Sequence, residues 1–389
     1  MQRREFVSAL SAGIAASSAG CIGSLSESDS TPTEQRDTQT PTATRTETPT
    51  ATQTEKSTDT PTETRTPPPK PPEHMFGLEG RTVPRLEDTS PVTRKFTQSI
   101  GRMRTEFTIR FAEQLYDYYQ GRVRTGNYGA YTSDTFDKNA ISGITNSLEA
   151  YRDRNDMTDR QMIDHAIAWV QGMEYTQDKP ATGYNEYPKY PLETLYDRGG
   201  DCEDTAILLA EVFNKLGYGS ILIELPQAKH MAVGVKGNDE IPGAYYTKNG
   251  NKYYYVETTG SGWRVGEVPD DVKQQGAQAN LLPVNKYPSL SQQWLTGPLS
   301  NGKFETLVAV FNFGTRPATS AEVQVELETE GGEIVAQKRK SVSTVGPTGR
   351  KEVKFTLDPP EGTPVRLRSG VVSDGTVVDL SESDMQSPD

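Results

Sequence analysis

Two hydrophobic periods follow each other along the middle of the chain. Apolar residues alternate with polar ones over residues 107–111, which predicts a strand. Helical spacing follows over 113–122 and again over 158–173, where Thr158 is placed to cap the second helix. A third helix is predicted over 202–216, because apolar residues at helical spacing fill this run and a glycine follows it.

Strand-like runs come after the third helix, at residues 220–225, 229–235 and 253–259. Helices followed by an antiparallel sheet are typical of an α+β domain. We therefore predict the α+β fold class for this part of the chain.

The last part of the chain consists of short alternating runs separated by Gly, Pro and Asp turns. These runs predict an antiparallel β-sandwich, with strands at 306–313, 322–327, 334–345, 352–357, 364–372 and 377–380. The segment NFGTRPA, residues 312–318, resembles a turn of immunoglobulin-like adhesion modules. That resemblance implies an all-β immunoglobulin-like domain whose work is spacing or binding.

The first residues have the layout of an export signal. Arg3 and Arg4 precede a short apolar run rich in Ala, Ser and Gly, as in twin-arginine signals. The run ends in SAGC at Cys21, which resembles the lipobox of prokaryotic lipoproteins, although Ser18 stands where an aliphatic residue is usual. We expect residues 1–21 to be the signal and Cys21 to be lipidated. An ordinary cleaved signal is the alternative.

Composition divides the rest of the chain. Residues 22–75 are rich in Thr and Pro, with Thr at every second position over 38–54. Such a tract has too few apolar side chains to offset the entropy cost of ordering, so it predicts a disordered stalk. The remaining length indicates two domains, which we place at residues 76–298 and 299–389.

The formal net charge of −12 argues against nucleic acid or anionic lipid as the main partner. It is typical of a solvated acidic surface and suits a haloarchaeal protein. The sequence has no metal-ligand motif, phosphate-binding loop or dinucleotide fingerprint. We therefore expect no cofactor and no metal site.

Candidate chemistry centres on Cys202. The chain has two cysteines, and Cys21 belongs to the signal, so Cys202 has no partner for an intramolecular disulfide. A helix start favours a thiolate and offers backbone N–H groups to an oxyanion. Glu203 and Asp204 oppose the thiolate by repulsion and fit better as first-turn or capping residues.

His230 is the expected general base. Of the three histidines, His74 lies at the end of the stalk and His165 lies in mid-helix, on a face shared with charged residues. His230 instead lies in the sheet that follows the cysteine helix. The next strand carries Glu257, which is either the carboxylate that orients the imidazole or a residue on a solvent-exposed edge.

Four short motifs are similar to those of the transglutaminase-like superfamily, in its prokaryotic cysteine peptidase branch. They are YPLETL at 190–195, GGDCEDTA at 199–206, HMAVGV at 230–235 and YVETT at 255–259. The resemblance covers residues 103–269. It implies a papain-like domain with Cys202 as nucleophile, His230 as general base and acid, and Glu257 as orienting carboxylate, where many relatives have Asp.

The same resemblance implies a second oxyanion donor before Cys202. Gln171, Tyr175 and Gln177 are the candidates, and the sequence leaves the choice among them open. Asp178 and segment 191–195 also match the family pattern, and for both we expect structural roles.

Three functions compete. The first is an exported cysteine hydrolase or acyltransferase that attacks amide or isopeptide bonds through a thioester at Cys202. The second is a transglutaminase-like module without turnover that binds or scaffolds, and the third is a surface adhesion protein that works through its sandwich. The intact Cys202, His230 and Glu257 set favours the first. Its expected substrate is a protein or peptide, cell-envelope material included, at the outer face of the cytoplasmic membrane, where the lipid on Cys21 would anchor the enzyme.

Overall fold

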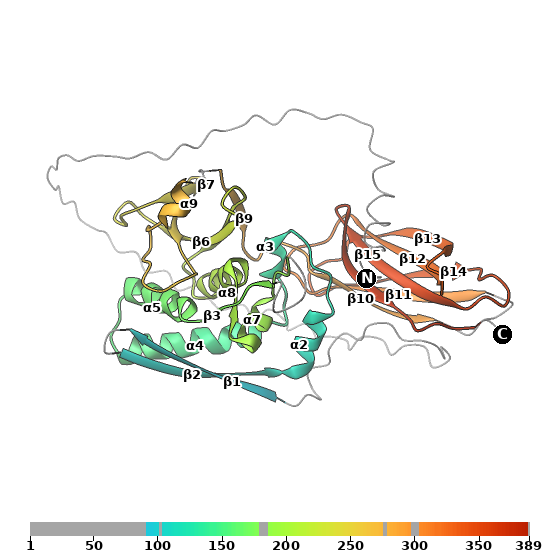
Figure 1. Ribbon diagram of the computed structural model, residues 1–389, viewed down its shortest axis with the longest axis horizontal. Helices are drawn as coiled ribbons and strands as arrows, with labels where there is room; N and C mark the ends of the chain where they lie inside the picture. Colours follow the sequence, from blue (N-terminus) through green and yellow to red (C-terminus); the bar gives the residue numbers. More distant parts are fainter. Residues whose placement is uncertain (1–90, 101–102, 179–185, 275–277, 297–302, 388–389) are drawn as a thin grey trace, which may run out of the picture.

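The computed structural model describes residues 91–100, 103–178, 186–274, 278–296 and 303–387 (Figure 1). The predicted signal with Cys21, and the predicted stalk at 22–75, lie outside the described residues and stay predictions. No helix among the described residues is both long and apolar enough to span a membrane.

A long β-hairpin opens the described part of the chain and lies under the first helices (Figure 1). Its strands pair antiparallel, and Phe96 and Phe107 stack with ring centroids 5.5 Å apart. Trp169 packs edge-on against Phe107 at 5.1 Å, which fixes a helix on the hairpin. The elements are β1 (Pro91–Ile100), β2 (Met103–Ala112), α2 (Glu113–Gln120), α3 (Tyr128–Tyr131), α4 (Lys138–Arg154) and α5 (Asp159–Gln171).

The central helix, α8, carries Cys202 at its first position and packs against β5 and β6 of a curled antiparallel sheet (Figure 1). Its side chains from position 204 to position 213 are all buried, so it is covered on every side. The sheet order is β7-β8-β6-β5-β9. The elements of this half are β3 (Glu174–Tyr175), α7 (Pro191–Asp197), β4 (Gly199–Gly200), α8 (Cys202–Lys215), β5 (Ser220–Leu225), β6 (His230–Gly237), β7 (Tyr245–Lys248), β8 (Asn251–Val256), α9 (Asp270–Gln274) and β9 (Asn280–Pro283).

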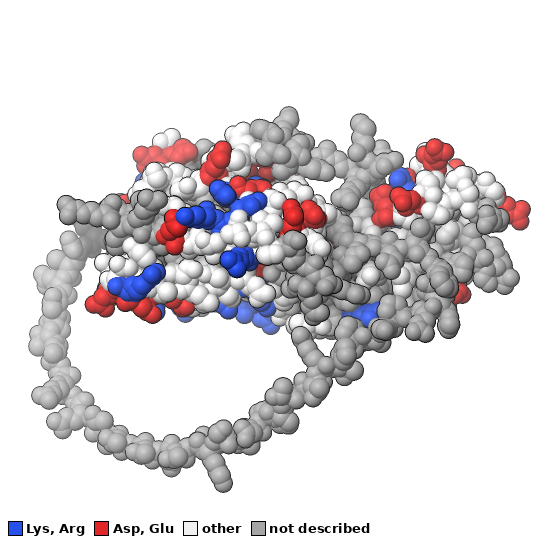
Figure 2. Space-filling model, turned by 90° about the horizontal axis from the view of Figure 1, so that it is seen from below, with Lys and Arg blue, Asp and Glu red and all other residues white. Residues whose placement is uncertain are grey.

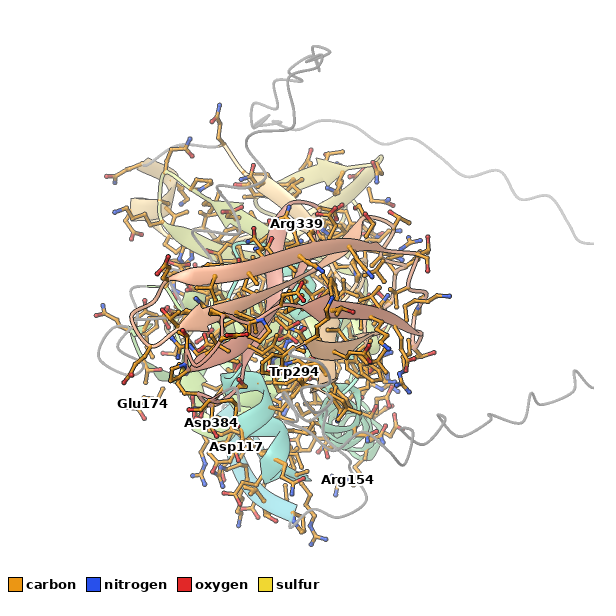
Figure 3. All side chains as sticks on the ribbon, turned by 90° about the vertical axis from the view of Figure 1, so that its right-hand side faces the viewer. Asp117, Arg154, Glu174, Trp294, Arg339 and Asp384 are labelled. Atoms are coloured by element: carbon orange, nitrogen blue, oxygen red, sulfur yellow. The ribbon has the colours of Figure 1, made fainter. Side chains whose placement is uncertain are left out.

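Two antiparallel sheets, in the orders β10-β11-β14 and β13-β12-β15-β16, form the C-terminal unit. Alternate residues of these strands pack into one core with Trp294, which is 1% exposed and lies in the interior in Figure 3. The strands are β10 (Leu290–Thr296), β11 (Phe304–Asn312), β12 (Ala321–Thr329), β13 (Ile334–Val342), β14 (Arg350–Leu357), β15 (Val365–Ser373) and β16 (Thr376–Glu382).

The turn at 312–318 is held by one side chain. Asn312 accepts hydrogen bonds from the N–H groups of Ser289 and Gly314, and it donates to the carbonyls of Arg316 and Val345. Gly314 lies so close to the chain before β10 that an added Cβ would be 2.3 Å from the Ser289 nitrogen. Packing therefore explains the residues of this segment that suggested an adhesion module.

The predicted fold class is wrong, because the first domain is not the expected papain-like α+β domain. The two packed antiparallel sheets after it do agree with the predicted β-sandwich. The described residues are mostly β, with more residues in strands than in helices, and the sheet beside α8 is curled and antiparallel. Strands β1, β7 and β9 were not predicted from the sequence, whereas the strand predicted at 107–111 is part of β2. The starts of two helices were predicted correctly. Helix α5 begins after Thr158, which forms a capping box, and α8 begins at Cys202.

Charges of both signs lie interspersed on the face of the molecule seen in Figure 2. The pair between Lys95 and Glu106, with 2.6 Å between Nζ and Oε1, is one exposed example. Exposed pairs of this kind contribute little stability because water screens them.

Arg122 joins the two units through a buried network. Its guanidinium donates to the Tyr118 hydroxyl at 2.9 Å and to Asp134 at 3.4 Å in the first unit. It also donates to the Leu290 carbonyl at 2.9 Å in β10, and Ser289 Oγ donates to Asp134 at 2.6 Å. The boundary between the units therefore contains a paired buried charge rather than only apolar contacts.

Arg122→Met should lower the free energy of unfolding by about 3–5 kcal/mol, because it leaves Asp134 buried without its cation. Arg160→Met is the matched control, since the pair between Arg160 and Asp164 is exposed and worth at most about 0.5 kcal/mol. Urea denaturation followed by circular dichroism measures both. Equal losses in the two variants would contradict a special role for Arg122.

Candidate active site

Two glycines bring the chain close to the start of α8. Gly199 and Gly200 form β4, which pairs parallel with β3. A Cβ added at Gly200 would lie 2.4 Å from Cβ of Asp204, so only glycine fits there. The position of Cys202 therefore depends on this close contact.

Lys189 is buried beside the same turn and stabilises it through contacts on both sides of Cys202. Its buried Nζ lies 3.0 Å from Asp197 Oδ2 and donates to the Gly199 carbonyl at 3.1 Å. Its backbone N–H donates to Asp204 Oδ1 at 2.7 Å. Asp204 also accepts a hydrogen bond from the N–H of Asp201 at 3.4 Å, which confirms its predicted capping role.

The Cys202 thiol donates a hydrogen bond to Glu203 Oε2 at 3.1 Å. Burial raises the pKa of this thiol, and the Glu203 charge and hydrogen bond raise it further. The backbone N–H of Met231 lies close enough to lower the thiol pKa, but the first two effects outweigh it. The resting group is thus a protonated thiol, not the thiolate that a helix start alone would favour.

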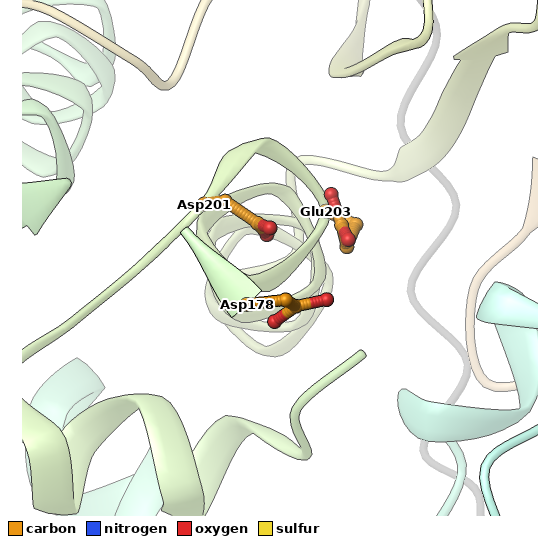
Figure 4. Close-up of side chains that lie close together, drawn as sticks. All are labelled: Asp178, Asp201 and Glu203. Carbon is orange, nitrogen blue, oxygen red and sulfur yellow. The ribbon is translucent and has the colours of Figure 1, made fainter. Parts of the chain in front are cut away.

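Three carboxylates gather around the start of α8 (Figure 4). Oxygens of Asp178, Asp201 and Glu203 all lie within 4.8 Å of one another, a spacing that would admit a metal ion. Burial, together with repulsion from Asp204 and Glu203, raises the pKa of Asp201 to about 10, and burial also raises the pKa of Asp178. Protonation therefore already relieves the repulsion in this cluster, and its geometry alone does not assign a metal.

His230 and Glu257 are brought together as expected. The distance from His230 Nε2 to Glu257 Oε2 is 2.9 Å, and the imidazole is 14% exposed while the carboxylate is 1% exposed. The alternative that Glu257 is a solvent-exposed edge residue is therefore wrong. Its second oxygen, Oε1, accepts from the N–H groups of Thr258 and Thr259 and from the Thr259 hydroxyl at 2.7–3.0 Å.

These hydrogen bonds decide the charge of Glu257. Burial pushes the pKa of Glu257 upward, but the hydrogen bonds from His230 and Thr259 outweigh burial and hold the pKa below its usual value. An ionised carboxylate can only accept, so Nε2 of His230 carries the proton. The lone pair of the neutral imidazole is therefore on Nδ1.

Other contacts connect the cysteine helix to the His–Glu pair. Thr205, one turn after Cys202, has its Oγ1 2.9 Å from Oγ1 of Thr258, the residue after Glu257. The Met231 N–H that faces the sulfur belongs to the residue after His230. The three predicted catalytic residues thus lie on neighbouring segments. Among the described residues, however, the thiol donates to Glu203, and no hydrogen bond joins it to His230.

The three candidate oxyanion donors differ in their surroundings. Gln171 is fully engaged, since its Nε2 donates to the carbonyls of Glu257 and Trp263 and its Oε1 accepts from the Gly262 N–H. Tyr175 is 55% exposed and lies close enough to Cys202 for the cysteine to contribute to raising its pKa. Gln177 is exposed. Gln171 therefore braces the loop that carries Glu257, and Tyr175 is the candidate beside the thiol.

The other histidines do not join this group. His165 is 1% exposed and stacks on Tyr151 with centroids 4.8 Å apart, so it lies in the core and not on a charged face. His74 lies outside the described residues. Asp178 accepts from the Tyr187 N–H, and Glu193 of segment 191–195 pairs with Arg124 at 2.7 Å, which confirms structural roles for both.

Two contributors were missed from the sequence. Tyr255 donates to Glu257 Oε2 at 2.8 Å, and its position two residues before Glu257 on one strand face was the available signal. Lys189 has no comparable signal, because its role depends on burial against Asp197 and Asp204.

Comparisons with known proteins place the chain in no family. No family model and no curated protein matches it. A solution structure of a CARDB domain from Pyrococcus furiosus is 22% identical, covers 26% of this chain and 95% of its own, and has a TM-score of 0.22. A crystal structure of that domain in complex with di-metal ions is 21% identical, covers 25% of this chain and 87% of its own, and has a TM-score of 0.20. A DUF3823 family protein from Bacteroides uniformis is 14% identical, covers 40% of this chain and 72% of its own, and also has a TM-score of 0.20.

The resemblance to the transglutaminase-like superfamily is wrong. The matching structures have β-sandwich folds, and no transglutaminase-like structure is found among them. The motif residues that suggested the family have local structural reasons. Gly200 makes room for Asp204, Asp204 caps α8, and Thr205 joins the helix to Thr258.

Glu203→Gln should make the Cys202 thiol more reactive, because it removes the carboxylate whose charge and accepted hydrogen bond favour the protonated thiol. In full-length chain with Cys21→Ser, Cys202 is the only thiol, and iodoacetamide labelling at pH 8 should accelerate about tenfold for each unit by which the thiol pKa falls. Glu113→Gln, an exposed change on α2, is the control. An unchanged labelling rate in Glu203→Gln would contradict this account of the resting thiol.

Proposed function

We propose that this protein is a cysteine hydrolase or acyltransferase that acts on amide or isopeptide bonds through Cys202, His230 and Glu257. The observation that carries the proposal is the His230–Glu257 pair, whose buried carboxylate is supplied with donors on both oxygens beside the helix start that bears Cys202. The imidazole is partly exposed, and among the described residues no hydrogen bond is found to its Nδ1, so this nitrogen could accept a proton.

The chemistry divides among these residues as follows. The Cys202 proton moves to Nδ1 of His230, the sulfur attacks the carbonyl carbon, and the resulting imidazolium is stabilised by Glu257. N–H groups in the first turn of α8 would hold the oxyanion. The C–N bond then breaks as His230 protonates the leaving amine, and water or a second amine releases the acyl group from the thioester.

This sequence requires the thiol to leave Glu203 and turn to His230. A substrate that displaces the contact between Cys202 and Glu203 would start the reaction. The proposed substrate is a protein or peptide, cell-envelope material included, because an exported enzyme meets such material. Hydrolysis and acyl transfer share the thioester and differ only in the acceptor.

A second candidate is a binding or adhesion module without turnover. The observation that favours it is the protonated thiol, whose proton is donated to Glu203 rather than to His230. In that case the β-sandwich and the site would serve only as recognition surfaces.

Acylation by p-nitrophenyl acetate separates the two candidates. The full-length Cys21→Ser chain should gain one acetyl group on Cys202, seen by intact mass and peptide mapping. His230→Ala should slow this acylation about 100-fold, as expected for loss of a general base. His165→Gln is the control, since that histidine is packed on Tyr151. Equal rates in His230→Ala and the parent chain would support the module without turnover.

The proposed location is the outer face of the cytoplasmic membrane, through a lipid on Cys21 at the end of a twin-arginine signal. Cys21→Ser should move the protein from the membrane fraction to the soluble fraction in cells of a prokaryote that lipidates exported proteins. Immunoblotting of the two fractions measures the change. Continued membrane association of the variant would contradict lipid anchoring.

A further inference from the structure

Tyr255 and His230 share one oxygen atom. The Tyr255 hydroxyl donates to Glu257 Oε2 at 2.8 Å, and His230 Nε2 lies 2.9 Å from the same oxygen. Tyr255 is fully buried in β8, which ends at Val256, one residue before Glu257. The phenol is therefore fixed beside the His230–Glu257 pair.

The other carboxylate oxygen is already occupied. Oε1 accepts from Thr258 and Thr259 and is thereby tied to the end of the strand. Rotation of the carboxylate would break these contacts together with the one to Tyr255. His230 is thus paired with a single, fixed oxygen.

Tyr255 remains a donor throughout the working pH range. Burial raises its pKa, and the neighbouring Glu257 charge raises it further, so the phenol stays protonated. The negative charge on Oε2 is therefore always divided between two donors.

We propose that Tyr255 is a positioning residue that fixes Glu257 Oε2 opposite His230 and, by sharing that oxygen, reduces the basicity of the imidazole. Only the consequence of this inference rests on the proposed function. A less basic His230 stays neutral at lower pH and can therefore accept the thiol proton there. The hydrogen-bond geometry itself is independent of turnover.

Other charged groups near this pair lie on three elements. Cys202 and Glu203 lie at the start of α8, and Tyr246 on β7 and Asp271 on α9 act electrostatically on Tyr255. None of these groups donates a hydrogen bond to Oε2 among the described residues. The effect assigned to Tyr255 is therefore separable from theirs.

The direction in which Tyr255→Phe should change the His230 pKa follows from the charge on Glu257 Oε2. Loss of the phenol leaves His230 as the one remaining donor to that oxygen, so more of the charge is available to stabilise the imidazolium. The pKa of His230 should rise. Because Tyr255→Phe keeps the ring and removes one hydrogen bond, its cost in stability should be about 1 kcal/mol, and the variant should fold.

Histidine titration by NMR tests the proposal in the full-length Cys21→Ser chain. The chain has three histidines, so labelled imidazole carbons give a simple spectrum in which His230→Gln assigns one signal. Tyr255→Phe should raise the His230 pKa by about 0.5–1 unit, and the pH profile of acetylation should move upward by the same amount. Tyr246→Phe, a phenol on β7, is the control and should leave the His230 pKa unchanged.

The His165 signal reports on folding, because that ring is buried against Tyr151. An unchanged or lower His230 pKa in Tyr255→Phe, with the His165 signal intact, would overturn the proposal. The proposed function fails separately. If His230→Ala acetylates normally while Tyr255→Phe still raises the His230 pKa, the hydrogen-bond coupling holds and the catalytic role does not.

Discussion

The buried carboxylate of Glu257 is the constraint on which the rest of the site depends. An ionised group that is 1% exposed needs donors for both oxygens, and here five donor groups from His230, Tyr255, Thr258 and Thr259 supply them. These donors come from three segments of the chain, because Thr258 and Thr259 share one loop. The carboxylate therefore joins β6, β8 and the loop after β8, and Gln171 ties that loop to α5.

At the start of α8, by contrast, there are more carboxylates than groups that stabilise their negative charge. There the carboxylates outnumber the nearby cation, since Asp178, Asp201 and Glu203 lie together and Lys189 pairs with Asp204. Protonation relieves part of the repulsion within this group, and the thiol keeps its proton and donates a hydrogen bond to Glu203. The dipole of a helix N-terminus is equivalent to about half a charge. Adjacent full charges in a buried setting outweigh it, which explains why the thiol rests protonated.

The sequence predicted local features better than global ones. The helix after Thr158 and the helix from Cys202 could be predicted because caps and spacing are encoded within one turn. Helix α4 was not predicted, although Ile141, Ile144 and Leu148 lie at helical spacing. Polar residues separate these three and make the apolar face less evident in the sequence. The fold class was wrong because it rested on short motifs, of which Gly200, Asp204 and Thr205 have local structural reasons.

The candidate site shows the same limit at the level of single atoms. Scarcity of cysteine and histidine was enough to select Cys202 and His230, and an acid in a strand was enough to select Glu257. Which side chain accepts the hydrogen bond of the thiol depends on side-chain rotamers, and the sequence does not encode those locally. The distance of 3.1 Å between Cys202 Sγ and Glu203 Oε2 is therefore the structural fact that changes the chemistry most. In the proposed reaction, activation of the thiol, rather than its identity, is therefore the step that a substrate has to supply.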